Sequence, residues 1–540
     1  MARTPLLSRF QALVQDFREA ERSGRPIEAV QAERRQRLTR RDFIKVGGAA
    51  VGALALAGRI PAFAQGAPRI AIVGGGIAGL NAALTLQDHG LASTVYEASD
   101  HVGGRMHSDT TSWLNGQVSE HCGELIDTGH ATIRALAQRF GLPLANLRAA
   151  ELSGSTDTYF FDGTYYLAAQ ANQDFKPVYT ALVNDNNAAP FPTLYNSFTQ
   201  AGFDLDHMSL FDWIETRVPG GHASMMGQLL DVAYNIEYGN VTQQQSSLNI
   251  VYLLFNTKQF KIFGASDEKF HIKGGNELLP RAIAAALPPS SVKLQTAMDG
   301  VVQNGNGTFT LDLINPNGSH SFKTFDHVIL ALPFSVLRNI LDDDSDFRDA
   351  GFNSLKQTAI NQLGYGKNAK LHLQFDTRYW RQTGHPWGRT TGTSFADTGY
   401  QNSWDVTRAQ NGTTGILVDY TGGGVPLASF TGDPNDPAVV AQFAQTFLDQ
   451  IENVFPGISA HWNGRATLDV PLTNPNLLGS YSYWKVGQYT KFSGYEGVRQ
   501  GNCHFAGEHC STNFQGFMEG AAEEGDRAAK EILTDYGIPF

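Results

Sequence analysis

Residues 69–79 read RIAIVGGGIAG, and this stretch decides the fold of the chain. Its first five residues are a short apolar run rich in β-branched side chains, which is typical of a buried parallel strand. The glycines allow a tight turn, close approach of a pyrophosphate to backbone N–H groups, and close packing of the following helix. A second predicted strand, at 93–96, is followed by Glu97, which is placed to accept from ribose hydroxyls. We therefore predict a Rossmann-like nucleotide-binding domain, with contacts from Gly74, Gly76, Gly79 and Glu97.

The first 64 residues have the features of an export signal. Residues 39–45 read TRRDFIK, an apolar run covers 46–58, and 62–64 read AFA, a small-x-small cleavage pattern. The paired arginines followed by phenylalanine match a twin-arginine signal, so we expect the Tat export machinery to deliver a periplasmic or secreted protein. The apolar run is shorter than the ~20 residues that cross a bilayer, which argues against stable membrane insertion. A basic amphipathic helix is the alternative interpretation.

Size and charge limit the function further. A chain of 540 residues is long for one hydrophobic core, so we expect two lobes. Residues 1–64 hold 12 of the 41 Lys and Arg and 6 of the 52 Asp and Glu, which leaves 29 basic and 46 acidic residues. This excess of 17 negative charges argues against nucleic acid and favours a cationic substrate. The cysteines are too few for a disulfide framework, and no Cys or His spacing predicts a metal site: Cys122, Cys503 and Cys510.

Residues 97–105 read EASDHVGGR and continue the nucleotide-binding motif. Two glycines let the backbone approach a ligand, and an arginine offers a forked donor to phosphate oxygens. The segment resembles an extension found in the flavin amine oxidase family, which includes monoamine, polyamine and L-amino-acid oxidases, where it wraps the FAD phosphates. The resemblance implies FAD as the cofactor, with Gly104 and Arg105 among its contacts.

The C-terminal part carries the other half of the resemblance. Residues 503–509 read CHFAGEH and 516–529 read GFMEGAAEEGDRAA, which is similar to the family's closing motif. There a glutamate ends a strand on the cofactor, and a helix begins with its positive end toward the isoalloxazine carbonyls. Residues 271–279 and 292–301 resemble two further family segments, the second with a methionine beside the adenine. The resemblance spans 69–535 and adds these expected contacts: Met298, Glu508, Gly516, Phe517 and Met518.

The matched segments imply an α/β fold with two interleaved domains. We expect a doubly wound parallel FAD-binding sheet, discontinuous in sequence, from residues 66–130, 271–333 and 466–540. By elimination, residues 131–270 and 334–465 form a mixed α+β substrate domain. Helical patterns at 133–140 and 229–233 support this division, as does the alternation at 370–375, which predicts a half-buried strand.

A lysine is the first candidate catalytic residue. Residues 365–375 read YGKNAKLHLQF and resemble the segment that supplies the family's flavin-facing lysine, which would be Lys370. The resemblance implies that its ammonium holds a water near flavin N5 and stabilises the charge that oxygen gains. An exposed strand lysine is the alternative.

Two aromatic residues are the other catalytic candidates. Tyr481 and Phe517 match segments that in amine oxidases place two rings as a sandwich before the flavin, where they would orient a neutral amine and keep the site dry. Ordinary core packing is the alternative. Ser480 stands where monoamine oxidases that attach flavin covalently carry a cysteine, so we expect non-covalent FAD.

Residues 120–127 read EHCGELID and resemble the strand end that passes the flavin ring, which adds Gly123 and Glu124 to the expected cofactor contacts. In amino-acid oxidases of the snake-venom type, an arginine three places after the glycine clamps the substrate carboxylate. Ile126 occupies that position here, which weakens the amino-acid reading without excluding it. Asp127 could pair with the second ammonium of a diamine or cap the following helix.

The leading hypothesis is an oxidase that converts an amine or L-amino acid to an imine, with oxygen as acceptor, releasing hydrogen peroxide and, after hydrolysis, ammonia. A dedicated L-amino-acid oxidase is one alternative. A flavoprotein that desaturates a C–C bond is a second, and a non-catalytic exported flavoprotein is a third. The sequence leaves a homodimer open.

Overall fold

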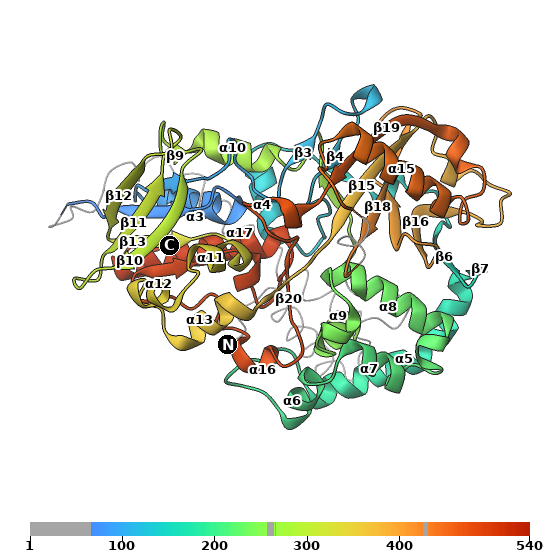
Figure 1. Cartoon of the computed structure of the whole chain (residues 1–540), viewed down its shortest axis with the longest axis horizontal. Coiled ribbons are helices and arrows are strands. Elements are labelled where there is room, and N and C mark those ends of the chain that lie inside the picture. Colours follow the sequence, from blue (N-terminus) through green and yellow to red (C-terminus); the bar gives the residue numbers. More distant parts are fainter. Residues whose placement is uncertain (1–65, 256–263, 265, 425–429) are drawn as a thin grey trace, which may run out of the picture. The chain divides into compact units, whose positions relative to one another are not determined.

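The computed structural model describes residues 66–255, 264, 266–424 and 430–540. The predicted export segment, residues 1–64, lies outside the described residues. None of the helices that are described is long and apolar enough to cross a bilayer. Residues 67–540 form a single unit built on two large sheets (Figure 1).

The first sheet has five parallel strands in the order β21-β13-β1-β2-β9. The glycine-rich turn joins the central strand to helix α3 (Ile77–Asp88), which packs against the C-terminal helix α17 (Met518–Asp535). At their crossing a side chain on Gly525 would overlap the carbonyl of Ala78, so glycine is required for this approach. The strands are β1 (Ile70–Val73), β2 (Thr94–Tyr96), β9 (Val292–Lys293), β13 (His327–Leu330) and β21 (Cys503–Phe505).

A smaller antiparallel sheet follows β9. It consists of β10 (Ala297–Gln303), β11 (Phe309–Ile314) and β12 (His320–Phe325). Helices α11 (Phe334–Ile340) and α12 (Asp344–Asp349) pack on β10, and α13 (Ser354–Gln362) packs on α11. The helices of residues 334–362, which were expected in the substrate domain, therefore pack on the small sheet, and apolar side chains of both lie in one large core: Phe334, Leu337, Phe347, Val301 and Leu311.

The second large sheet has seven strands in the order β19-β15-β18-β17-β16-β6-β7. All neighbours are antiparallel except β16 and β6. The expected boundary at residue 466 falls inside β19, which stays paired with β15 through Asp469. The strands are β6 (Thr156–Phe161), β7 (Thr164–Tyr166), β15 (Ala369–Phe375), β16 (Thr390–Ala396), β17 (Asn402–Asp405), β18 (Gly415–Thr421) and β19 (Trp462–Asp469).

Strand β15 differs from the predicted half-buried strand, because all seven of its residues are buried. Leu371, Leu373 and Phe375 share a core with helix α15 (Pro437–Ile451). The alternate side chains face residues 113–124 of the nucleotide-binding part, where Gln374 donates to the Leu114 carbonyl. The alternation is real, but its polar face is covered by another part of the chain.

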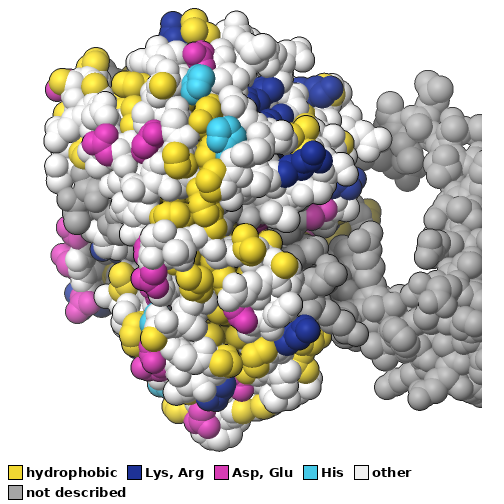
Figure 2. Space-filling model, turned by 90° about the vertical axis from the view of Figure 1, so that its right-hand side faces the viewer, with side chains coloured by type: hydrophobic (Ala, Val, Ile, Leu, Met, Phe, Trp, Pro, Cys, Tyr) yellow, Lys and Arg dark blue, Asp and Glu magenta, His cyan; other side chains and the backbone are white. Residues whose placement is uncertain are grey.

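Helices α5 to α9 cover one side of the seven-stranded sheet, and α8 contacts β16, β17 and β18 (Figure 1). On the face drawn in Figure 2, the charged side chains of the described residues are interspersed with hydrophobic ones. The helices of this layer are α5 (Ala168–Ala188), α6 (Gln200–Asp206), α7 (Leu210–Arg217), α8 (Met225–Tyr238) and α9 (Leu248–Leu254).

Three short strand pairs among the described residues lie outside these sheets. β3 (Ser108–Asp109) pairs with β4 (Ser119–Glu120), and β14 (Gly364–Tyr365) pairs with β20 (Ser482–Tyr483). β5 (Leu144–Asn146) pairs with β8 (Phe270–Ile272), so the expected boundary at residue 270 also falls inside a strand. The pairs β14–β20 and β5–β8 join segments that were expected in different domains. The remaining helices are α4 (Ala131–Arg139), α10 (Leu278–Ala286) and α16 (Tyr489–Phe492).

Candidate active site

One cavity of about 1090 Å³ joins the carboxyl ends of β1, β2, β13 and β21 to the seven-stranded sheet. The carboxyl ends of parallel strands are where open α/β sheets bind their ligands. Every predicted site residue except Gly79 lines this cavity: Gly74, Gly76, Glu97, Gly104, Arg105, Gly123, Glu124, Met298, Lys370, Tyr481, Glu508, Gly516, Phe517 and Met518.

The glycine turn has the geometry that a bound pyrophosphate needs. Gly74 has φ 105, and a side chain there would lie 2.6 Å from the Ala331 carbonyl oxygen. Gly79 does not reach the cavity, because it packs inward: a Cβ on it would lie 2.0 Å from the Gly74 carbonyl oxygen. Its role is close packing of α3 against the turn.

Glu97 ends β2 at the cavity wall and is buried. Its carboxylate accepts from the Gly75 amide at 2.6 Å and from the Ser99 amide at 2.8 Å. These bonds fix the carboxylate where a ribose would lie, and a carboxylate oxygen accepts more than one bond. The turn and the fixed carboxylate therefore fit a dinucleotide cofactor.

Arg105 and Glu508, which both line the cavity, also pair with each other at 2.9 Å. Glu508 also accepts from the Ser482 amide at 3.1 Å and from the Gly516 amide at 2.9 Å, so it ties three segments together. Burial acts to raise the pKa of Glu508, but the Arg105 guanidinium outweighs it and keeps that pKa below its ordinary value. Beside them, the buried ring nitrogens of His509 have no partner among the described residues, which leaves them free for a bound group.

Lys370 is buried at the cavity wall and held by three acceptors. Its Nζ donates to the carbonyls of Glu120 at 3.2 Å and Cys122 at 2.9 Å, and to the Glu124 carboxylate at 2.9 Å. Burial acts to raise the pKa of Glu124, but the Lys370 charge outweighs it and lowers that pKa to about 2. Glu124, which was predicted to contact the cofactor and lines the cavity, is also the counter-ion of Lys370.

Aromatic side chains form a continuous wall beside this ion pair. The Trp404 indole donates to Glu124 at 2.9 Å and meets the Tyr420 ring edge to face, with 5.2 Å between centroids. The hydroxyls of Tyr420 and Tyr481 are 2.9 Å apart, and Tyr481 also bonds the Ile236 carbonyl at 3.1 Å. Phe517 lines the same cavity. Trp404 and Tyr420 were missed by the sequence analysis, since only the pairing of β17 with β18 brings them here.

Two further glutamates line the cavity and were also missed. Burial raises the pKa of Glu237 to about 8 and that of Glu268 to about 7. No hydrogen bond or ion pair of either carboxylate is found among the described residues. Both carboxyl groups line the cavity, and with these pKa values the negative charge that they bring to it develops as the pH rises through about 7 and 8.

No arginine stands at the position of the carboxylate clamp, and Arg408, which does line the cavity, is bonded to other residues. Ile126, at the position of the arginine clamp, is fully buried and does not line the cavity. Arg408 does line it, but its guanidinium already donates to Glu151 at 3.1 Å and to the Asp405 carbonyl at 3.1 Å. Asp127 neither caps α4 nor lines the cavity, because its carboxylate accepts from the Ser266 hydroxyl and the Glu268 amide.

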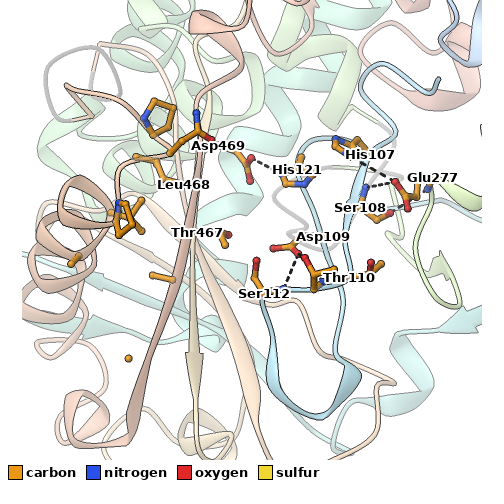
Figure 3. A pocket seen from close by; sticks show the side chains of 18 of the residues that line it. His107, Ser108, Asp109, Thr110, Ser112, His121, Glu277, Thr467, Leu468 and Asp469 are labelled. Carbon is orange, nitrogen blue, oxygen red and sulfur yellow. Dashed lines mark hydrogen bonds and ion pairs between the residues drawn. The ribbon is translucent and has the colours of Figure 1, made fainter. Parts of the chain in front are cut away.

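A second cavity, of about 640 Å³, adjoins the first and shares His107, His121 and Asp469 with it (Figure 3). His121 contacts Asp469 at 2.6 Å, and the rings of His107 and His121 have centroids 4.5 Å apart. Burial and the neighbouring His121 lower the pKa of His107 to about 4, so it is neutral. None of the predicted site residues lines this second cavity.

Ser480 lines the main cavity, where its hydroxyl donates to Asn368 at 2.5 Å. A serine hydroxyl does not form the thioether with flavin that a cysteine would at this place.

Comparisons with known proteins agree with this geometry. A family model described as flavin containing amine oxidoreductase matches residues 77–533. The chain is 24% identical over 492 residues to the putative L-amino-acid oxidase YobN of Bacillus subtilis, covering 86% of this chain and 94% of that protein. It is 25% identical to polyamine oxidase 2 of Arabidopsis thaliana, covering 87% of this chain and 90% of the relative.

Solved structures give the same fold. Cyclohexylamine oxidase from Brevibacterium oxydans superposes with a TM-score of 0.73 at 19% identity, covering 87% of this chain and all of that chain. Putrescine oxidase bound to putrescine superposes with a TM-score of 0.69 at 20% identity, covering 86% of this chain and 99% of that chain. Because the family model matches most of its length, this chain belongs to the flavin-containing amine oxidoreductases, and it is an oxidase that acts on amines.

Proposed function

We propose that this protein oxidises a primary amine that carries a second positive charge. The C–N bond becomes an imine, the two electrons and two protons removed reduce dioxygen to hydrogen peroxide, and water then hydrolyses the imine to an aldehyde and ammonia. The observation that carries the substrate class is the pair Glu237 and Glu268, two carboxylates in the cavity wall with no cationic partner bonded to them among the described residues.

Each of the two glutamates lies at a position that costs folding free energy. Glu237 lies in the last turn of α8, where the helix dipole disfavours a carboxylate. Glu268 has φ 42, a left-handed conformation that costs a non-glycine residue about 1–3 kcal/mol. A substrate cation beside these two half-buried carboxylates would offset the two costs.

The same observations disfavour an amino-acid substrate. Its carboxylate would enter a cavity lined by Glu237 and Glu268, and like charges repel once these glutamates ionise as the pH rises through about 7 and 8. Arg408 lines the cavity and could bind a substrate carboxylate, but its guanidinium already donates to Glu151 and to the backbone carbonyl of Asp405. We therefore propose that Glu237 and Glu268, rather than Asp127, pair with the second ammonium of a diamine.

The proposed cofactor is FAD, held without a covalent bond. When bound, it supplies a two-electron acceptor for the amine and a donor for dioxygen. The turn at Gly74 and Gly76 would hold its pyrophosphate, Glu97 its ribose and Met298 its adenine. Glu508 would hold Arg105 and the Gly516 turn in place around it.

The roles proposed for the other residues follow from their positions. Tyr420, Tyr481 and Phe517 exclude water and orient the neutral amine. Lys370 supplies a fixed positive charge at the wall, and Glu124 keeps its ammonium in one place. Trp404 fixes that carboxylate in turn.

The domain roles and the location of the protein are also proposals. The part built on the five-stranded sheet would bind FAD, and the part built on the seven-stranded sheet would bind the substrate. The twin-arginine segment supports export by the Tat pathway to the periplasm or beyond, and light scattering on the mature chain tests for a homodimer.

One anaerobic screen tests the function. The purified protein is mixed with simple amines, diamines and common L-amino acids, and loss of flavin absorbance is followed. We expect diamines to bleach the flavin fastest, with one ammonia and one peroxide per turnover once air is admitted. Peroxide without ammonia would instead identify C–C desaturation, and flavin that no amine bleaches would identify a non-catalytic flavoprotein.

A further inference from the structure

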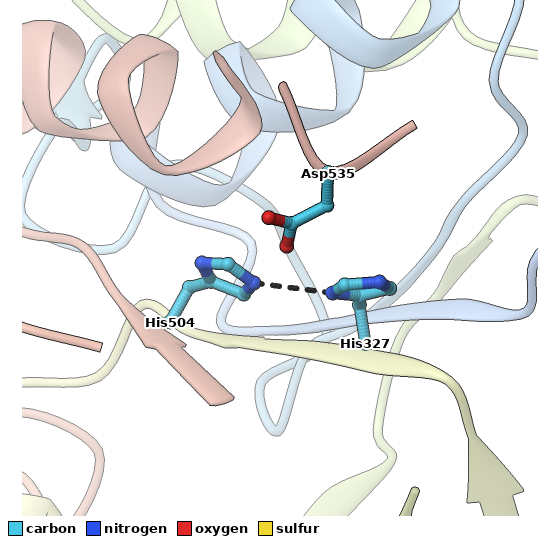
Figure 4. Close-up of side chains that lie close together, drawn as sticks. All are labelled: His327, His504 and Asp535. Atoms are coloured by element: carbon cyan, nitrogen blue, oxygen red, sulfur yellow. Dashed lines mark hydrogen bonds between the residues drawn. The ribbon is translucent and has the colours of Figure 1, made fainter. Parts of the chain in front are cut away.

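Two histidines and an aspartate meet at the edge of the five-stranded sheet, outside both cavities (Figure 4). His327 begins β13, and His504 lies in the neighbouring strand β21. Asp535 ends α17. The histidines are buried and the aspartate is exposed, so the group is reachable from solvent on one side only.

The spacing of the ligand atoms suits one metal ion. His327 Nδ1 and His504 Nε2 are 3.2 Å apart, and an Asp535 carboxylate oxygen lies within 4.8 Å of both. Two imidazole nitrogens on a tetrahedral zinc ion lie roughly 3.3 Å apart, given Zn–N bonds of about 2.0–2.1 Å. A direct hydrogen bond between the rings has a similar length, so the surrounding residues must distinguish the two arrangements.

Glu531 and Arg499 hydrogen-bond the side chains that would bind the metal, as neighbouring residues in metal sites ordinarily do. His504 Nδ1 bonds the Glu531 carboxylate at 2.7 Å, which turns the lone pair of Nε2 toward His327. Metal-bound histidines almost always make such a bond to a carboxylate. Arg499 bonds one oxygen of Asp535 at 2.7 Å and leaves the other free to bind an ion.

The charges around the group bear on binding as well. The positive charge of Arg499 opposes the ion, while Glu531 and Asp535 offset it.

We propose that His327 Nδ1, His504 Nε2 and the free oxygen of Asp535 bind one divalent transition-metal ion, with zinc as the best fit and water as its fourth ligand. Two imidazoles and a carboxylate suit zinc, and a site with three protein ligands retains one position for water. The ion would tie the end of α17 to two strands of the sheet. Because α17 begins beside Phe517, it would steady the helix that borders the main cavity.

The other groups of possible ligand atoms among the described residues are less suited. Asp342, Asp343 and Asp346 form an acidic group alone. His320 already contacts both oxygens of Asp312 and is half exposed. His320 therefore serves as a matched control, since it is a histidine beside carboxylates in the same part of the chain.

Equilibrium dialysis of the flavin-loaded protein against zinc chloride tests the proposal, with bound zinc measured by mass spectrometry and the melting temperature recorded. We expect one zinc per chain and a higher melting temperature in its presence. His327→Gln and Asp535→Asn should each lose binding, Glu531→Gln should weaken it roughly 10- to 100-fold, and His320→Gln should change neither measurement.

Asp535 is exposed, so its substitution tests the site even if His327→Gln fails to fold. Cobalt(II) gives a second signature, because a tetrahedral site absorbs at longer wavelengths than the flavin. Wild-type protein that retains no zinc after dialysis, or that retains as much as Asp535→Asn, would overturn the proposal.

Discussion

Replacing Lys370 with methionine would leave the Glu124 carboxylate buried without its counter-ion. The pKa of Glu124 lies at about 2 against an ordinary 4.5, and each pKa unit is worth about 1.4 kcal/mol. The pair thus contributes about 3 kcal/mol near neutral pH, within the roughly 3–5 kcal/mol that breaking a buried pair costs. We expect Lys370→Met to lower the free energy of unfolding by about that much.

Urea unfolding of the single and double variants measures this coupling. Adding Glu124→Gln to Lys370→Met should restore much of the loss, because no buried charge then remains. The stabilisation from a carboxylate whose pKa is lowered on folding is present above its ordinary pKa and lost as the pH falls toward the folded value. The contribution of the pair in the wild type should therefore be lost between pH 4.5 and about 2. Because burial alone raises the pKa of Glu124, the gap between wild type and Lys370→Met should already narrow above pH 4.5 and be closed near pH 2.

The same variant tests the role of the lysine in catalysis. Reduction by amine depends on positioning, whereas delivery of electrons to oxygen creates an anion that a nearby charge stabilises. Stopped-flow absorbance should show flavin reoxidation slowed by roughly 100- to 1000-fold and reduction changed far less. The exposed Lys293→Met is the control. Unaltered stability together with unaltered reoxidation would refute both the ion pair and the assigned role.

Three further predictions concern the cofactor, export and pH. Acid or heat should release all FAD from the protein, since Ser480 offers no thioether, and flavin that stays on denatured chain would contradict this. Replacing Arg40 and Arg41 together with lysine should leave the protein in the cytoplasm, as cell fractionation would show, whereas normal export would disprove the signal. The preference for diamines over monoamines should grow as the pH rises through about 7 and 8, because Glu268 and Glu237 then ionise; a preference that is flat with pH would exclude them.

Local motifs could be predicted from the sequence because their physics is local. The turn at Gly74 and the carboxylate of Glu97 follow from a strand, a turn and a helix that are adjacent in the chain. The burial of both faces of β15 could not be predicted, because residues 113–124, which cover its polar face, are distant in the sequence. Gln374 of β15, for example, bonds Leu114 across 260 positions.

Contacts between residues that are distant in the sequence could not be predicted either. Arg105 and Glu508 were each placed on the cofactor, but they bind each other across 403 positions. Glu237 and Glu268 belong to no motif, and only the fold brings them to one cavity. The two histidines of the proposed metal site are 177 positions apart, so no local ligand spacing in the sequence points to them.

The central claim is that a dicationic amine is the substrate, and one ratio tests it most directly: kcat/KM for cadaverine divided by kcat/KM for pentylamine, above pH 8 where both glutamates are ionised. We predict a ratio of at least about 10, as one compensated buried charge is worth more than 1.4 kcal/mol. The double substitution Glu237→Gln and Glu268→Gln should bring it near one, while the exposed Glu215→Gln should not. A wild-type ratio near one, with pentylamine still oxidised, would contradict the dicationic substrate and leave the amine oxidase intact.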